Sequence, residues 1–206
     1  PKRDWSSDVC SSDLTALCML LSIVLIYDAL YVIKGLVNNM DTMSLDQNIV
    51  SLTGNNGNKN VMAASLIIKV PFALYLWVRG QFFQKIMGVV SLFLGVFAVF
   101  LMNTRSTYVA LLIISLIFII TSIYFLHRNK KKLTSQLLLF IIPIVLAFLL
   151  ANTVLSNAIK MQEFQGGYGS VTKRIGDITV KSEEGSRIHL WWAAFDYFKK
   201  HPVLAA

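Results

Sequence analysis

The sequence predicts an all-α fold: a polytopic integral membrane bundle of about five transmembrane helices, with an interfacial amphipathic helix near the C-terminus. The composition favours a membrane protein, because 55% of the residues are apolar and 15% are charged, whereas about a quarter of a soluble domain is charged. Five apolar runs approach the ~20 residues that a helix needs to cross a bilayer core. These runs lack the strict alternation of β-barrel strands, so we expect helices.

The five predicted spans define a transmembrane region over residues 15–155. They cover residues 15–36, 61–78, 86–102, 108–126 and 137–155. Residues 1–14 resemble one reading frame of a sequencing-library adapter, and their Ser/Asp-rich sequence changes abruptly into the first apolar run. We therefore expect residues 1–14 to be an artefact. We expect residues 156–206 to be a truncated outer loop segment, and the chain to be a fragment at both ends.

Basic residues in the connections predict the orientation of the spans. Residues 127–132 hold the densest positive cluster, and Arg79 and Lys85 lie in a second short connection. The positive-inside rule places both connections in the cytoplasm. The connections at 37–60 and 103–106, and everything after residue 156, then face outward. The most unusual polar sequence of the chain is therefore expected on the outer face.

A second kind of helix is predicted over residues 186–200. Ser186 is a candidate N-cap and Pro202 a stop signal. Apolar residues recur at helical spacing on one side, with three charged residues expected largely opposite: Ile188, Trp191, Trp192, Phe195 and Phe198 against Asp196, Lys199 and Lys200. This pattern predicts an amphipathic helix in the outer membrane interface, with or without a further role.

Arg105 directly follows the third span, in the turn Asn103-Thr104-Arg105-Ser106, and is expected at the start of the next helix. The unpaired N–H groups and positive dipole end of a helix start form a phosphate site that a guanidinium would complete. Arg187 repeats this arrangement in the first turn of helix 186–200. The alternative, which the sequence leaves open, is an arginine that snorkels to lipid headgroup phosphates.

Two more outer segments carry candidate residues. The Asn/Gly-rich run 52–60 opens the second span, and Asn58 or Asn60 is expected to cap that helix. A ligand role for this run, with Lys59 beside the cap, is an equally open alternative. Arg174 belongs to a group of cations that follows the fifth span.

Two charged residues are predicted inside spans, where isolated charges are costly. Asp28 lies in the first span and Lys69 in the second, each about eight residues from the outer end, which corresponds to a depth of roughly 12 Å. We expect the two side chains to face each other, or a shared polar cavity, beside Pro71. A purely structural pair and a functional pair are both compatible with this spacing.

Four stretches of the chain resemble the O-antigen ligase/polymerase family of bacterial membrane glycosyltransferases. They are Gly57-Asn58-Lys59-Asn60 followed by Ala63-Ala64 and Lys69-Val70-Pro71-Phe72; Thr104-Arg105-Ser106-Thr107-Tyr108; Ser186-Arg187-Ile188-His189-Leu190-Trp191; and His201-Pro202-Val203-Leu204. The second is similar to the Ser-Arg-Gly/Ala turn of the family, with Thr104 and Ser106 in place of the usual residues. The order and spacing of the four stretches carry the resemblance more than any one of them.

The resemblance implies a metal-independent, cofactor-free transfer of a glycan from an undecaprenyl-diphosphate carrier. The implied acceptor is a lipid A-core sugar or a carrier-linked glycan; membrane lipids are the other expected partners, and no nucleic acid is expected. The resemblance assigns diphosphate binding to Arg105 and Arg187, with Arg174 as a third candidate. Supporting roles are expected for Asn58, Lys59, His189, Asp28 and Lys69. The implied location is the bacterial inner membrane, with a periplasmic active face.

No catalytic residue is assigned from the sequence. The proposed base of the family is a histidine that we expect beyond Ala206, and His201 matches the His-Pro position instead. The alternative function is a multi-span transporter or flippase of lipid-linked glycans, because Pro71 and Pro143 interrupt predicted spans. The choice between ligase and polymerase stays open.

Overall fold

The computed structural model describes residues 5–40, 42–54, 57–128, 132–161, 171–172, 175 and 187–200. The elements of this part of the chain are helices: α1 (Trp5–Asn38), α2 (Leu45–Ser51), α3 (Lys59–Arg79), α4 (Phe82–Met102), α5 (Arg105–Arg128), α6 (Lys132–Met161) and α8 (Arg187–Lys200). The predicted all-α class is confirmed. Helix α1 includes residues 5–14; whether these residues are an artefact stays a prediction.

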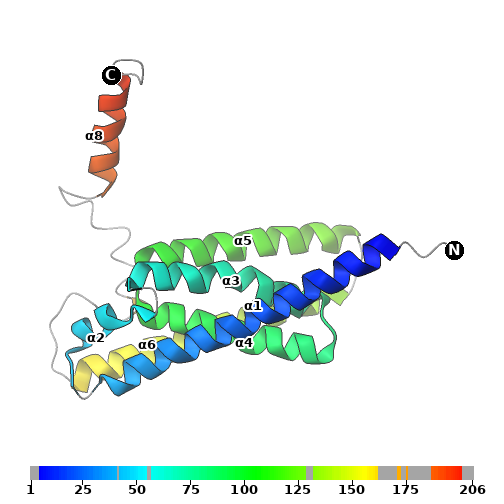
Figure 1. The fold of residues 1–206 in the computed structure, drawn as a ribbon, viewed down its shortest axis with the longest axis horizontal. Coiled ribbons are helices and arrows are strands. Elements are labelled where there is room, and N and C mark those ends of the chain that lie inside the picture. Colours follow the sequence, from blue (N-terminus) through cyan, green and yellow to red (C-terminus); the bar gives the residue numbers. More distant parts are fainter. Residues whose placement is uncertain are drawn as a thin grey trace.

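The long helices run up and down in one bundle (Figure 1). Helices α1, α4 and α6 finish at the end of the bundle where α3 and α5 begin, and α2 lies at the same end. We call it the Arg105 end. The α3–α4 connection lies at the opposite end, so the connections divide between the two ends as the charge pattern predicts. Which end faces the cytoplasm stays a prediction.

Within the described residues, four helices are long and apolar enough to cross a membrane by length and composition. The four candidate spans are Ser12–Asn38, Lys59–Arg79, Phe82–Met102 and Ile141–Lys160. The predicted fourth span, 108–126, lies within α5, whose segment Arg105–Thr121 is a shorter apolar helix. The molecule is thus a multi-span membrane protein, and most of its helices extend beyond the predicted limits because polar first and last turns carry no hydropathy signal.

Helix α2 was not predicted, because seven residues inside a polar connection show too little periodicity. Ser44 is its N-cap, and the Ser44 side chain accepts a hydrogen bond from the backbone N–H of Gln47. Leu45 and Ile49, four residues apart, are both buried. The buried Asn48 side chain donates a hydrogen bond to the carbonyl oxygen of Leu36 at 2.8 Å. Helix α2 is therefore fastened to the last turns of α1.

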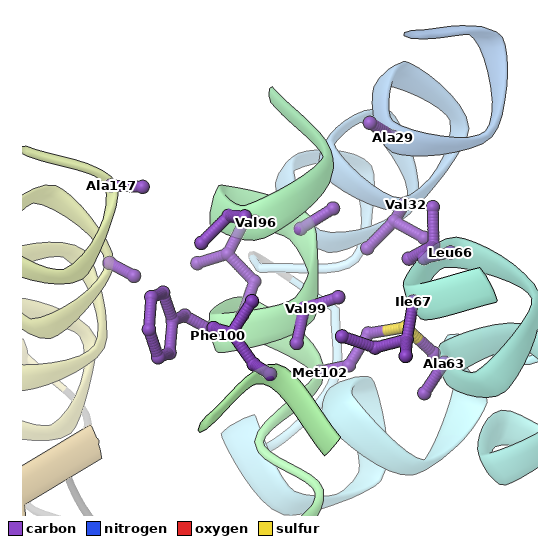
Figure 2. Packing of buried hydrophobic residues seen from close by; sticks show 14 of the residues in the cluster. Ala29, Val32, Ala63, Leu66, Ile67, Val96, Val99, Phe100, Met102 and Ala147 are labelled. Atoms are coloured by element: carbon purple, nitrogen blue, oxygen red, sulfur yellow. The ribbon is translucent and has the colours of Figure 1, made fainter. Parts of the chain in front are cut away.

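Helix α4 is the centre of the bundle. It packs against α3, α1 and α6, and it is the most buried of the candidate spans. Figure 2 shows Val96 and Val99 of α4 between the other helices, with the Phe100 ring directed toward α6, the helix that carries Ala147. The Phe100 ring also meets the ring of Phe148 edge-on at 5.5 Å between centroids. The core of the bundle is thus organised around one helix.

Two glycines bring neighbouring helices close to α4. A Cβ added at Gly88 would lie 2.8 Å from the carbonyl oxygen of Ala73 and 2.9 Å from the backbone nitrogen of Trp77. A Cβ added at Gly95 would instead meet the side chain of Leu25 at 2.8 Å. Close backbone approach through small residues is a common means of association between membrane helices. Gly88 therefore sets the distance between α3 and α4.

Helix α8 lies apart from the bundle in Figure 1, and its side chains from Trp191 to Lys200 are exposed. The prediction of a helix over residues 186–200 is confirmed by the backbone of α8. Lys199 was predicted on the charged side, and this was wrong: its Nζ lies 4.8 Å from the ring centroid of Phe195. Positions 195 and 199 are one helical turn apart, so the lysine covers the aromatic side through a cation–π contact.

The close approach at Gly88 leads to a graded prediction. Gly88→Ala is expected to destabilise the protein by about 1–3 kcal/mol, because backbone atoms of α3 must move to admit a methyl group. Gly95→Ala is the matched control and should cost less, since the opposing Leu25 side chain can change its rotamer. Thermal unfolding in detergent measures both. Equal melting temperatures for the two variants would contradict the assigned role of Gly88.

Candidate functional site

The connection between α4 and α5 is a two-residue reversal formed by Asn103 and Thr104. Asn103 adopts a left-handed conformation, with φ 53° and ψ 48°, and its backbone N–H bonds to the carbonyl oxygen of Phe100 at 3.2 Å. Asparagine tolerates this conformation better than other residues with a Cβ, apart from aspartate. The sharp reversal places Arg105 at the first position of α5 and at the end of the bundle.

The side chains of this turn are buried and hydrogen bonded to one another. The Tyr108 hydroxyl donates to Oδ1 of Asn103 at 2.9 Å, and the Thr107 hydroxyl donates to the carbonyl oxygen of Thr104 at 2.8 Å. The hydroxyls of Thr104 and Thr107 are also hydrogen bonded to each other. Buried polar groups that satisfy one another in this way restrict the backbone to one conformation. The turn therefore holds the backbone of Arg105 in a fixed position.

Arg105 combines three features of an anion site. Its backbone begins α5, so it lies among the N–H groups and the positive dipole end of that helix. Its side chain is half-buried, and its Nε is shielded from solvent. A cation held in the first turn of a helix is unfavourable by itself and favourable when an anion binds. The arrangement suits a phosphate or diphosphate group.

An apolar groove of about 310 Å³ adjoins this turn. It is lined by residues of α4, α5 and α6 and by Ile175, namely Phe100, Tyr108, Leu111, Leu112, Ser115, Ile144, Val145, Phe148 and Ile175. Tyr108 belongs to both the turn and the groove, since its hydroxyl bonds to Asn103 while its ring lies 5.6 Å from the Phe100 ring. The polar turn and the apolar groove are therefore contiguous.

The structure brings the start of α3 to the same end of the bundle as Arg105. Asn58 is the N-cap of α3, and its Oδ1 accepts a hydrogen bond from the backbone N–H of Asn60 at 2.8 Å. This confirms the predicted cap; a ligand role for Asn58 stays a prediction. Lys59 begins α3 as Arg105 begins α5, and the two helices pack against each other. Two helices thus begin with a cationic residue at the Arg105 end of the bundle.

Asp28 and Lys69 form the predicted pair. Nζ of Lys69 lies 2.6 Å from Oδ2 of Asp28 and also donates to the Ser65 hydroxyl at 2.6 Å. The Asp28 side chain is only 18% exposed and the Lys69 side chain only 13% exposed. Pro71 follows Lys69 by two residues in α3. The prediction that the two charges face each other is confirmed. Their direct contact joins α1 to α3; a functional role for the pair stays a prediction.

Several candidate residues lie outside the described part of the chain. Arg174 and His201 are among them, as are the side chains of Arg187 and His189. The backbone places Arg187 at the first position of α8, as predicted. Within the described residues, no group of three or more His, Cys, Asp or Glu side chains is arranged to hold a metal ion.

The fold and the site define a class: a multi-span helical membrane protein with an arginine at the start of α5 and an apolar groove that shares Tyr108 with the same turn. Residues 90–205, more than half of the chain, match the family model of the O-antigen ligases, so the chain belongs to the O-antigen ligase family. The match includes Arg105, Arg174 and Arg187 and begins after Lys69. A search of curated proteins and a search of solved structures found no match.

The residues that support Arg105 were not predicted from the sequence. Thr107 and Tyr108 were noted only as part of a motif, yet they form the hydrogen bonds that fix the turn. Their positions, two and three residues after Arg105, were the available signal, because a polar group in the first turn of an apolar helix needs a buried partner. No comparable signal indicated the groove, whose lining comes from three helices and Ile175.

The paired charges lead to a prediction about stability. Asp28→Asn or Lys69→Met alone is expected to destabilise the protein by about 3 kcal/mol, because each leaves one uncompensated charge inside the bundle. The double variant leaves no charge and should recover most of the loss. Thermal unfolding of the four proteins in detergent gives the comparison. Single variants as stable as the unmodified protein would show that the pair does not hold α1 and α3 together.

The turn leads to a second prediction about stability. Asn103→Gly keeps the left-handed backbone accessible and loses the bond to Tyr108, so a cost of about 1 kcal/mol is expected. Asn103→Val adds the strain of a β-branched residue at positive φ and should cost about 1–2 kcal/mol more. Melting temperatures of the two variants separate these effects. A valine variant as stable as the glycine variant would contradict a conformational requirement at this position.

Proposed function

We propose that this protein is a membrane glycosyltransferase of the O-antigen ligase or polymerase type, which moves a glycan from an undecaprenyl-diphosphate carrier to a lipid-linked or lipid A-core acceptor. The observation that carries the proposal is the position of Arg105: a half-buried arginine at a helix start, in a turn that shares Tyr108 with an apolar groove and lies in the region that matches the family. The proposed location is the bacterial inner membrane, with the Arg105 end facing the periplasm.

The chemistry of the reaction explains why a fixed arginine is useful. When the glycosidic bond to the carrier breaks, negative charge accumulates on the departing diphosphate. Fixed cations and helix N–H groups placed where this charge develops stabilise the transition state. An arginine keeps its charge and offers several N–H donors in a plane that fits phosphate oxygens. Arg105 would bind the diphosphate, and the turn around Asn103 would keep it in place.

The groove supports a lipid-linked substrate over a soluble nucleotide sugar. A carrier of this kind has a diphosphate joined directly to a long apolar chain, so its site needs a cation next to an apolar surface. Tyr108 links the two parts in this protein, because it bonds to the turn and also lines the groove. Leu111 and Leu112 continue the groove along α5. The arrangement matches the polarity of the substrate from head to tail.

A transporter or flippase of the same glycans is the second candidate, favoured by the charged pair within the spans and by Pro71 and Pro143 inside α3 and α6. Polar groups near the middle of the membrane are typical of transport pathways. The direct contact between Lys69 and Asp28 weakens this alternative, because charges that bind each other are not available to a passing substrate. Transport without transfer would be detected as carrier-linked glycan that crosses the membrane unchanged.

Substitution of Arg105 in the intact protein tests the proposal. Arg105→Ala is expected to lower glycan transfer about 100-fold or more, as when a fixed donor to a developing negative charge is removed. Arg105→Lys keeps the charge but not the planar donors, so we expect an intermediate rate. Transfer is measured as glycan attached to the acceptor, together with the amount of protein in the membrane.

The control is Lys160→Ala, which removes an exposed cation from the last turn of α6 at the same end of the bundle. It should leave transfer unchanged. Transfer by Arg105→Ala at the level of the unmodified protein would overturn the assigned role of Arg105. Arg187→Ala is expected to impair transfer in the same way, because Arg187 begins α8 within the matched region.

A further inference from the structure

A second cavity, of about 650 Å³, lies at the Arg105 end of the bundle but outside the family-matched region. It is formed by the last turns of α1 and by the segment from Ser51, the last residue of α2, to Gly54. Its lining is Tyr27, Leu30, Tyr31, Val32, Lys34, Gly35, Asn38, Asn39, Ser51, Leu52, Thr53 and Gly54. The lining holds aromatic, amide, hydroxyl and ammonium groups. This is unusual for the flank of a membrane span.

Four polar residues of α1 that line the cavity form a stripe. Tyr27, Tyr31, Lys34 and Asn38 are spaced by four, three and four residues, so they share one face of the helix. The stripe runs from the last residue of α1 to a depth of roughly 16 Å. Tyr27 is 59% exposed and Tyr31 is 44% exposed. Polar side chains on a span at this depth are retained where they meet a polar partner or ligand.

The opposite wall of the cavity is held in place by hydrogen bonds. The Asn39 side-chain amide donates to the Ser51 hydroxyl at 3.4 Å, and that hydroxyl donates to the carbonyl oxygen of Asn48 at 2.7 Å. Asn48 in turn donates to the carbonyl oxygen of Leu36 on α1 at 2.8 Å. The two walls are therefore connected, and the cavity is preformed.

The charge of the cavity indicates the kind of ligand. Lys34 is the only charged residue among those that line it, and no carboxylate lies in the described lining. Within the described part of the chain Lys34 forms no ion pair. A cation near the membrane surface attracts anionic headgroups. A zwitterionic headgroup carries an ammonium group, for which the described lining offers no carboxylate partner. An anionic headgroup is therefore the better fit.

We propose that this cavity binds the headgroup of a net-anionic phospholipid, with the phosphate at the Lys34 ammonium. The amides of Asn38 and Asn39 and the hydroxyls of Ser51 and Thr53 provide hydrogen bonds to the headgroup. Leu30 is 50% exposed and Tyr27 is 59% exposed on the same flank. The Leu30 side chain and the Tyr27 ring contact the acyl chains. The site is separate from the Arg105 turn and does not rest on the proposed transferase activity.

Native mass spectrometry of the purified full-length protein tests the proposal with phosphatidylglycerol and with phosphatidylcholine of identical acyl chains. The unmodified protein should bind phosphatidylglycerol more tightly. Lys34→Ala should weaken this binding about fivefold, the effect of one basic residue near an anionic headgroup, and bring it to the level of phosphatidylcholine. Lys34 is exposed, so the variant is expected to fold, which its melting temperature verifies.

Lys160→Ala is the matched control, because Lys160 is an exposed lysine at the same end of the bundle and does not line the cavity. It should bind phosphatidylglycerol like the unmodified protein. Three results would overturn the proposal: equal affinity for the two lipids, equal loss in the Lys34 and Lys160 variants, or displacement of the lipid by inorganic phosphate at the same concentration as the lipid. The last would reveal a general anion site to which the acyl chains contribute nothing.

Discussion

The close packing of α4 against its neighbours is the constraint on which the rest of the structure depends. Gly88 brings the α3 backbone into contact with α4, and the α4 side chains of the core fill the space toward α1 and α6. Apolar side chains gain little from leaving lipid, so shape and close contact replace the hydrophobic effect as the basis of association. Because α4 is fixed in this way, the turn at its end is fixed as well.

The position of the turn gives the candidate site its character. Asn103 reverses the chain within two residues, and the bond from Tyr108 to Asn103 holds the start of α5 against the end of α4. Arg105 therefore presents its charge from a rigid helix start at the end of the bundle. A loop could carry the same arginine but would lose binding energy to the ordering of its backbone. Rigid placement suits the role proposed for Arg105, which is to bind a negative charge as it develops.

The Arg105 end of the bundle combines two electrostatic environments. Lys59 and Arg105 begin helices, so their charges add to the positive ends of two helix dipoles. Lys34 instead lies one turn before the end of α1, among tyrosine and amide groups. Both environments attract anions, but the first adjoins an apolar groove of about 310 Å³ and the second a cavity of about 650 Å³ with polar and apolar lining residues. A donor lipid and a membrane phospholipid would thus find different sites on one face.

The sequence by itself determined the class of the protein, most of its spans and the candidates at helix starts. Hydropathy and helix-start signals are local, so the spans, the cap at Asn58 and the place of Arg105 at the start of α5 follow from neighbouring residues. The pairing of Asp28 with Lys69 was also expected, because buried charges at equal depth need each other. Only the tertiary structure decided the short helix α2, the groove beside Tyr108 and the cavity at Lys34. Helix α2 is too short to show a periodicity, and the walls of the groove and of the cavity come from separate segments of the sequence. Contacts between separate segments leave no periodic signal along the chain.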